Sequence, residues 1–292
     1  MRNFFLLPNI MVQNANALSS QYTIGFPAMT AWLGAVHFLQ RKINEISMFE
    51  DIKLLSVGVI SHDFDLKFYK GSRDYDNSII GTANPLSRSG DRPSFIEEAR
   101  CSITVSLLVE YEGLNAVGPD EFKDFLKDII HSKMKIAGGD VLRFNNIEIV
   151  KVETQEDFAK LKRKLMPGYV ITERKDLMQN AMSAGKDAID SLLDYLSVIH
   201  ECTENGTGEI AWEAKRLTNG WIVPIATGFQ GISGLEQAKN QRDPYVPHRF
   251  VESIVTLGEF IMPYRLESLD EMLWKYRYDP DQELYICENI NQ

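Results

Sequence analysis

The chain has 292 residues, of which 44% are hydrophobic and 25% are charged, a composition that excludes an intrinsically disordered protein. Its 41 acidic residues outnumber 31 Lys and Arg, and the resulting formal net charge of −10 argues against a protein that binds nucleic acid through a broadly basic surface. The three cysteines are far apart, and no segment is long and apolar enough to span a bilayer, so we expect a cytoplasmic protein without membrane contact.

Predicted strands and helices alternate along the first half of the chain. The apolar run at residues 3–12 predicts a strand rather than a signal peptide, because it is short and meets Pro8 and then polar residues. A polar loop leads to Pro27, after which apolar residues recur at spacings of three and four and predict a helix over residues 28–46. The following elements are then predicted in order: a strand from Ile52, a surface insertion rich in Gly, Asn, Ser and Pro, a strand at 101–112, a helix at 119–134 and a strand at 141–153.

This order of elements predicts an α+β fold. Two β-α-β units in succession build a ferredoxin-like sandwich, in which two helices cover one face of an antiparallel sheet. We therefore expect a ferredoxin-like βαββαβ domain at residues 1–152, with a long insertion at about residues 64–99 between its second and third strands. Many RNA-binding domains and many enzymes share this fold, so the fold alone does not decide the function.

The second half of the chain, residues 153–292, is expected to form an elaborated C-terminal α/β part packed on the first domain. Apolar periodicity predicts helices at 155–165, 186–200, 249–262 and 266–276. The remaining predictions are a turn at 203–208, a strand followed by a glycine-rich loop from Trp221, and a short closing strand at 284–287.

Patterns of catalytic or metal-binding residues are scarce. The sequence has no GxSxG nucleophile motif, no P-loop and no CxxC spacing, so we expect no cofactor and no metal. The segment from His62 to Asp65 superficially resembles an HD-type metal site, but polar residues at a strand end explain it equally well. His37 is the one candidate for general acid or base catalysis, since RNA-processing enzymes of this kind of fold use a histidine near the first helix. Its position between Val36 and Phe38 also fits a structural residue.

Amides and hydroxyls gather in the polar loop after the first predicted strand. These groups can donate to and accept from base edges and 2′-hydroxyl groups of single-stranded RNA. The alternative interpretation is that they only make the turn. The residues are Gln13, Asn14, Asn16, Ser19 and Ser20.

Cations and an amide in two other segments could hold phosphates. Arg88 and Arg92 lie in the insertion together with Asn84, and Arg on a loop can clamp phosphate oxygens through paired hydrogen bonds, unless the loop is merely solvated. Arg242 and Arg249 form a further polar and basic stretch before a predicted helix.

Glycines and aromatic residues offer two more candidate contacts. The pair Gly138-Gly139 would let the backbone approach a ligand closely, and a helix C-cap is the competing interpretation. Phe4 and Phe5 on the first strand could stack on bases or pack in the core.

The polar loop that contains Gln13 to Ser20 lies within a longer block that is similar to a known family. LPNIMVQNANALSSQYTIGFPAMTAWLGAVHFLQRK (residues 7–42) resembles the N-terminal signature of the second subunit of Csy complexes, the type I-F CRISPR surveillance (Cascade) particles. The similarity continues in order over nearly the whole chain through NPLSRSGD (84–91), EEARCSITVSLLV (97–109), AGGDVL (137–142), LMPGYVI (165–171), GWIVPIATGF (220–229) and RFVESIVTLGEF (249–260).

The resemblance implies a fold, a set of partners and the absence of catalysis. Members of that family have a ferredoxin-like domain of the RAMP type, related to RNA-recognition (RRM) domains, and bind the 5′ handle of the CRISPR RNA (crRNA) together with the large Csy subunit. They abut the first backbone subunit of the filament, near the place where target double-stranded DNA enters beside the protospacer-adjacent motif. The alternative is a RAMP-type endoribonuclease that processes repeat RNA with His37.

Where a block of this chain matches the family, the resemblance implies RNA contacts at the corresponding residues. Contacts are expected from the polar loop and from Gly138 and Gly139. In the insertion the match is partial, because the family loop is basic but variable there. For Arg242 and Arg249 the assignment to RNA, DNA or a partner protein stays open.

Overall fold

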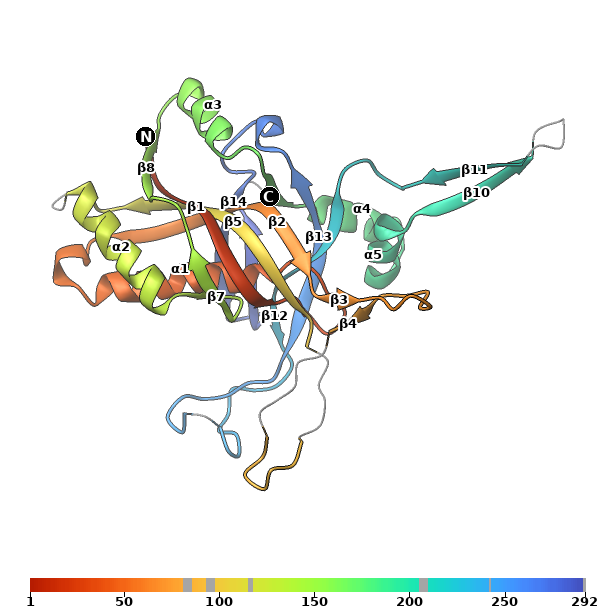
Figure 1. Ribbon diagram of the computed structural model, residues 1–292, viewed down its shortest axis with the longest axis horizontal. Coiled ribbons are helices and arrows are strands. Elements are labelled where there is room, and N and C mark those ends of the chain that lie inside the picture. Colours follow the sequence, from red (N-terminus) through yellow and green to blue (C-terminus); the bar gives the residue numbers. More distant parts are fainter. Residues whose placement is uncertain (81–85, 93–97, 115–117, 205–209, 242, 291–292) are drawn as a thin grey trace.

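The computed structural model describes residues 1–292 except 81–85, 93–97, 115–117, 205–209, 242 and 291–292. Three long strands form the centre of its main sheet (Figure 1). They are β1 (Arg2–Asn16), β2 (Lys53–Leu66) and β5 (Arg100–Glu112), and β5 lies between the other two, antiparallel to both. The other edge of β1 pairs with β7 (Gly139–Arg143) and β8 (Glu148–Val152), so the strand order here is β2-β5-β1 followed by β7 and β8.

Alternation along β1 divides the core between the two faces of the sheet. Phe5 and Leu7 point to one face, where they share a cluster with the apolar sides of α1 (Met29–Asn44) and α2 (Pro119–Lys133). Phe4 and Leu6 point to the opposite face, which α3 (Gln155–Lys164) covers. Both Phe4 and Phe5 are fully buried, so their interpretation as core residues is confirmed.

Strands from the second half of the chain close a ring onto β2. The path of hydrogen-bonded neighbours runs from β2 through β9, β13, β12 and β15 to β14, and β14 pairs again with β2 at Val57 and Gly58. All six strands of the ring are antiparallel to their neighbours. The additional strands are β9 (Tyr169–Glu173), β12 (Ile222–Gly231), β13 (Val251–Ile261), β14 (Leu273–Asp279) and β15 (Leu284–Asn289).

The remaining elements are short. They are β3 (Phe68–Tyr69) and β4 (Ser78–Ile79) in the insertion, β6 (Lys135–Ile136), the helices α4 (Lys175–Ser183) and α5 (Ala188–Leu196), the ribbon strands β10 (Ile199–Glu204) and β11 (Ile210–Lys215), and two 3-10 turns, η1 (Ser47–Phe49) and η2 (Pro263–Arg265). Within the described residues, no helix is long and apolar enough to cross a membrane.

The predicted elements of the first half are largely confirmed, with two corrections. The first strand does not end at residue 12 but continues to Asn16, so Gln13, Asn14 and Asn16 belong to the strand and not to a loop. The single strand predicted at 141–153 is interrupted, because the chain leaves β7 and the backbone N–H of Asn145 donates to the carbonyl of Pro8 before β8 begins.

Two predicted helices in the second half are wrong. Residues 249–262 contain strand β13, and residues 266–276 contain a turn followed by strand β14. Residues 256–260 are all buried, including the polar residues Thr256 and Glu259, so burial here does not follow the alternation of apolar and polar residues that would distinguish a strand from a helix. Helices were correctly predicted near α3 and α5.

Candidate functional site

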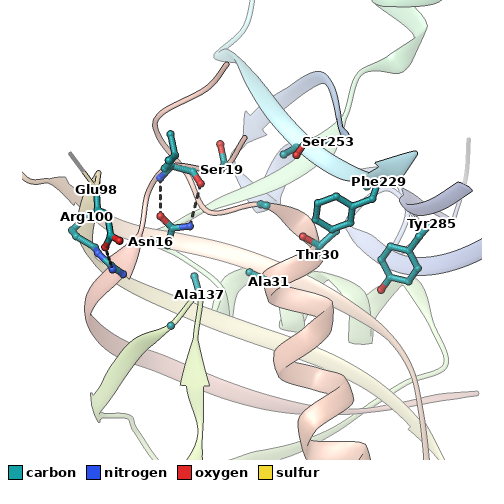
Figure 2. A pocket seen from close by; sticks show the side chains of 15 residues that line it. Asn16, Ser19, Thr30, Ala31, Glu98, Arg100, Ala137, Phe229, Ser253 and Tyr285 are labelled. Atoms are coloured by element: carbon teal, nitrogen blue, oxygen red, sulfur yellow. Dashed lines mark hydrogen bonds and ion pairs between the residues drawn. The ribbon is translucent and has the colours of Figure 1, made fainter. Parts of the chain in front are cut away.

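An open cavity of about 740 Å³ lies where distant segments of the chain meet, at the N-terminal end of α1 (Figure 2). It is bounded by the connection after β1, the turn between β6 and β7, the first residues of β5 and the strands β12, β13 and β15. We call it the α1 cavity. The side chains and backbone that line it belong to Asn16, Leu18, Ser19, Ala28, Thr30, Ala31, Glu98, Arg100, Ala137, Gly138, Ala226, Gly228, Phe229, Ser253 and Tyr285.

The connection from β1 to α1, residues 17–28, is held by its own polar side chains. The side-chain amide of Asn16 donates to the carbonyl of Leu18 (3.1 Å) and accepts from the N–H of Leu18 (3.1 Å). The hydroxyls of Ser19 and Ser20 lie 2.8 and 2.7 Å from the hydroxyl of Thr23. These bonds fix the loop, while Asn16 remains exposed with spare donor and acceptor capacity toward the cavity.

The turn between β6 and β7 gives its two glycines different surroundings. Ala137 and Gly138 both have positive φ (48° and 74°), as a two-residue hairpin turn of type I′ requires. The pair Gly138-Gly139 therefore belongs to a hairpin and is not a helix C-cap. Gly138 lines the cavity, and a Cβ there would meet nothing within 4 Å. Gly139 is buried, and a Cβ there would lie 2.7 Å from the carbonyl oxygen of Gln13. The close approach that Gly139 allows is thus an approach to β1.

Two features of the α1 cavity favour anions. The N-terminus of α1 faces it without a capping side chain, since the N-cap residue is Ala28, and the helix dipole places partial positive charge there. Arg100 also lines the cavity and forms an ion pair through one nitrogen with Glu98, a further lining residue (Figure 2). Its buried Nε has no hydrogen-bond partner within the described part of the chain.

The opposite wall is aromatic. Figure 2 shows the rings of Phe229 and Tyr285 across the cavity from Asn16 and Arg100. Tyr285 also stacks on Tyr276, with ring centroids 5.8 Å apart. Burial raises the pKa of Tyr285 to about 12, so its hydroxyl stays protonated and can donate a hydrogen bond at any physiological pH. The cavity can therefore take a planar ring on one wall and an anionic group on the other.

The structure brings only some of the predicted contact residues to this cavity. Asn16, Ser19 and Gly138 line it, Ser20 is buried within the connection from β1 to α1, and Gln13 and Asn14 are exposed at the end of β1. Asn14 has a φ of 60° within a β-bulge, which explains an Asn at this position.

The basic candidates lie elsewhere. Arg88 and Arg92 are exposed on the insertion and do not line the cavity. Arg249 precedes a strand rather than a helix, and its Nη2 lies 2.6 Å from a carboxylate oxygen of Glu283. Asn84 and Arg242 lie outside the described residues.

The lining residues that were not singled out from the sequence include Arg100, Phe229 and Tyr285. Arg100 was one of several cations around the insertion, and nothing in the spacing distinguished it. Phe229 lies within the block 220–229 that resembles the family, but Tyr285 is more than two hundred residues from Asn16 in sequence. Only the ring of strands that includes β12 and β15 brings these rings to the start of α1.

The histidines considered as catalytic or metal-binding residues, His37 and His62, do not line the α1 cavity. His37 is exposed on α1, beside the ring of Tyr276 and about 10 Å further along the helix than Thr30. Both ring nitrogens of His62 are used, one beside the carbonyl of Pro167 (2.5 Å) and one beside the hydroxyl of Ser106 (2.6 Å).

A second cavity is also lined by residues of the 17–28 connection, namely Ile24, Gly25 and Phe26. It has a volume of about 400 Å³ and is lined by the rings of Phe26, Phe64, Tyr169, Trp221 and Phe260. Among the described residues that line it, there is an acidic residue, Asp63, but no Lys or Arg. Of the two cavities, the α1 cavity is therefore the better site for a ligand that contains phosphate.

Comparison with known proteins identifies the family. The sequence model of the family described as CRISPR-associated protein (Cas_Csy2) matches residues 5–287 of this chain. A relative described as "CRISPR-associated protein Csy2", from Pseudomonas aeruginosa (strain UCBPP-PA14), is 33% identical over 309 aligned positions, which cover 96% of this chain and 93% of the relative. The chain therefore belongs to the Csy2 family of CRISPR-associated proteins, which are subunits of the type I-F Csy complex.

Proposed function

We propose that this chain is a non-catalytic subunit that binds the 5′ handle of the crRNA, together with the large Csy subunit, in the α1 cavity. One observation supports this most directly: Asn16 and Ser19 from one sequence block and Gly138 from another, all expected as RNA contacts, line a single cavity. In the proposed complex, Arg100 and the N-terminus of α1 hold phosphate oxygens. Phe229 and Tyr285 offer a surface on which a splayed base can stack.

The net charge fits a subunit that shares its RNA with a partner. With a net charge of −10, the chain has little long-range attraction for RNA, and Arg100 is the one cation among the described residues that line the cavity. RNA affinity then depends on assembly with the large subunit, and the backbone subunit and target DNA are the further proposed neighbours.

The proposal includes the fold and the domain division. The strand order β2-β5-β1 followed by β7 and β8, with α1 and α2 on one face, is the order expected for a ferredoxin-like RAMP domain at residues 1–152. Residues 153–292 then supply the elaboration, whose strands β12, β13 and β15 form one side of the cavity.

The test is purification of the tagged chain from cells that also express its neighbouring genes and a repeat-spacer array, followed by sequencing of the bound RNA. We expect one uniform repeat-derived 5′ end and co-purification of the large subunit. Replacing Phe229 with Ala should reduce the bound RNA several-fold without loss of folding, because the ring is half-buried at the cavity wall. Recovery of the chain alone and free of RNA would contradict the proposal.

A His37→Ala variant tests the alternative of an RNA-cleaving enzyme. We expect the same RNA content and the same repeat-derived end as in the wild type, because His37 lies outside the α1 cavity. Cleavage of repeat RNA by the purified chain, abolished in His37→Ala, would establish the alternative.

A further inference from the structure

A two-stranded ribbon projects from the body of the protein. Strands β10 and β11 pair only with each other among the described residues, and Figure 1 shows them extending away from α4 and α5. Every described residue of both strands is exposed. An isolated two-stranded ribbon is marginally stable in water, so an exposed ribbon without covering elements indicates a segment that contacts something outside the chain.

The register shows that the two faces of the ribbon differ. Directly opposite residues share a face, and one face has the pairs Ile199 with Lys215, Glu201 with Glu213 and Thr203 with Ala211. On this face the Nζ of Lys215 forms ion pairs with both carboxylates, at 2.8 Å from an oxygen of Glu201 and 3.2 Å from an oxygen of Glu213. This polar face has its charges paired within the ribbon.

The other face is apolar and uncovered. It has the pairs Cys202 with Trp212, His200 with Ala214 and Glu204 with Ile210. Trp212 is 69% exposed and Ile210 is 67% exposed, although tryptophan and isoleucine gain most from burial. The apolar side chains adjoin one another along the ribbon, with Glu204 at one end. We call this the Trp212 face.

The chemistry of this face selects the kind of partner. Neither strand places a Lys or Arg on it, and Glu204 would repel phosphates, so RNA is disfavoured. A large aromatic side chain surrounded by smaller apolar groups is the usual centre of a protein interface, and a carboxylate at its margin favours a cation opposite.

We propose that the Trp212 face docks another protein subunit of the complex, on a surface that is apolar at its centre and has a Lys or Arg facing Glu204. The inference rests on the proposed function only in that it requires a multi-subunit assembly. It concerns a surface distinct from the α1 cavity, since no ribbon residue lines that cavity.

The three cysteines provide the test. Cys202 is exposed on the Trp212 face, whereas Cys101 and Cys287 are buried. The assembled complex is treated with N-ethylmaleimide, and the adduct at each cysteine is followed by mass spectrometry, with the urea-unfolded chain as the unprotected reference. We expect Cys202 in the complex to react at least about ten-fold more slowly than in the unfolded chain. A rate in the complex equal to the unprotected rate would overturn the proposal.

A crosslink then identifies what covers the face. With p-benzoylphenylalanine at position 212, we expect illumination to produce a crosslink to another protein subunit. A crosslink to the guide RNA or to a second copy of this chain would overturn the proposal. Trp212→Ser should reduce retention of the crosslinked subunit several-fold, and the matched control Glu213→Ser, on the opposite face, should not.

The RNA content of the same samples separates this inference from the proposed function. A uniform 5′ handle with fully reactive Cys202 would overturn the docking surface alone. A protected Cys202 in a complex that contains no handle RNA would overturn the RNA function alone.

Discussion

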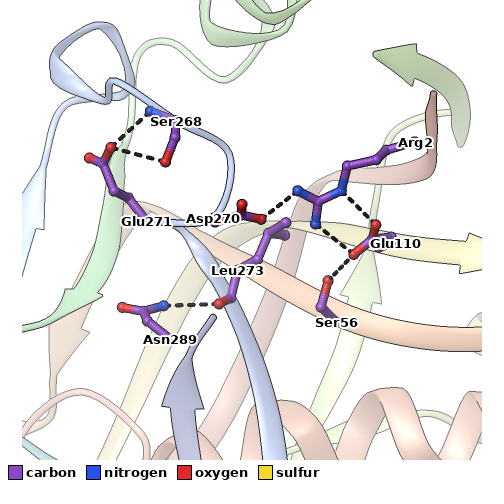
Figure 3. A network of polar contacts seen from close by, with 8 residues as sticks. All are labelled: Arg2, Ser56, Glu110, Ser268, Asp270, Glu271, Leu273 and Asn289. Carbon is purple, nitrogen blue, oxygen red and sulfur yellow. Dashed lines mark hydrogen bonds and ion pairs between the residues drawn. The ribbon is translucent and has the colours of Figure 1, made fainter. Parts of the chain in front are cut away.

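The guanidinium of Arg2 grips the carboxylate of Glu110 through two parallel hydrogen bonds, Nε to Oε1 at 2.6 Å and Nη2 to Oε2 at 2.9 Å (Figure 3). The hydroxyl of Ser56 donates to the same carboxylate (2.7 Å), and the remaining guanidinium nitrogen is paired with Asp270. Strands β1, β2 and β5 are thereby connected to the turn before β14. Residues from both ends of the chain meet at this network.

Replacing Arg2 with Met should destabilise the protein by about 2–3 kcal/mol, because Glu110 is only 9% exposed and would keep Ser56 as its main donor. Urea unfolding followed by circular dichroism measures the change. The double variant Arg2→Met/Glu110→Met should recover much of the loss, since no buried charge is left unpaired. Equal losses in the single and the double variant would contradict this account.

Replacing Gly139 with Ala should destabilise the protein by about 1–3 kcal/mol, because the new methyl group would overlap the backbone of β1 at Gln13 and Ala15. Gly138→Asn is the matched comparison, since its position is open and Asn tolerates a φ of 74°. We expect Gly138→Asn to fold normally in a urea titration but to release handle RNA from the complex more readily, because the longer side chain enters the α1 cavity. A Gly138→Asn variant that is less stable but retains handle RNA as well as the wild type would show that Gly138 is not part of the binding site.

Replacing Arg100 with Gln should weaken handle binding about five- to ten-fold and reduce the dependence of log affinity on log salt by about 0.7, the value for one phosphate contact on a single strand. Binding of labelled handle RNA to the reconstituted complex at several salt concentrations measures both quantities. Arg163→Gln, on the exposed side of α3, is the control with the same charge change. An unchanged salt dependence in Arg100→Gln would remove Arg100 from the phosphate contacts.

Stability should fall as the pH rises above 9, because burial raises the pKa of the Cys101 thiol to about 11 and that of Cys287 to about 12, against an ordinary value of 9.0. The unfolded state loses these protons first, so the stabilisation is complete below pH 9 and is lost progressively up to the folded-state values. At pH 10 each thiol should cost about 1 kcal/mol.

The measurement is urea unfolding under reducing conditions at pH 8 and pH 10. Cys287→Ala should lose less stability between these two pH values than the wild type does. Cys202→Ala, whose thiol is exposed in the folded state, should lose as much as the wild type. A pH dependence that is identical in all three proteins would show that Cys287 does not contribute.

Local periodicity predicted those elements whose burial is one-sided. In α1 the apolar positions Trp32, Val36, Leu39 and Ile43 are all buried, as their helical spacing required. Strand β13 was mistaken for a helix because Thr256 to Phe260 are all buried, so burial there does not follow the alternation of apolar and polar residues.

The α1 cavity could be predicted only in part, for a related reason. Asn16 and Ser19 stood out because amides and hydroxyls gather locally in the sequence. The opposite wall depends on register, since Gly228 pairs with Ile286 and this pairing places β15, and with it Tyr285, beside β12. Long-range pairing of this kind leaves no local signal, and the same is true of the bidentate contact between Arg2 and Glu110.

The closure of the strand ring onto β2 has a consequence for synthesis of the chain. Among the described residues, the edge of β2 opposite β5 acquires its neighbours only from β9 and from residues 273–274, near the C-terminus. While the chain emerges from the ribosome, the part of this edge near Val57 therefore stays unpaired until nearly all of the protein has been made. An exposed strand edge is a site of aggregation, so premature termination before β14 should yield insoluble fragments rather than a smaller folded protein.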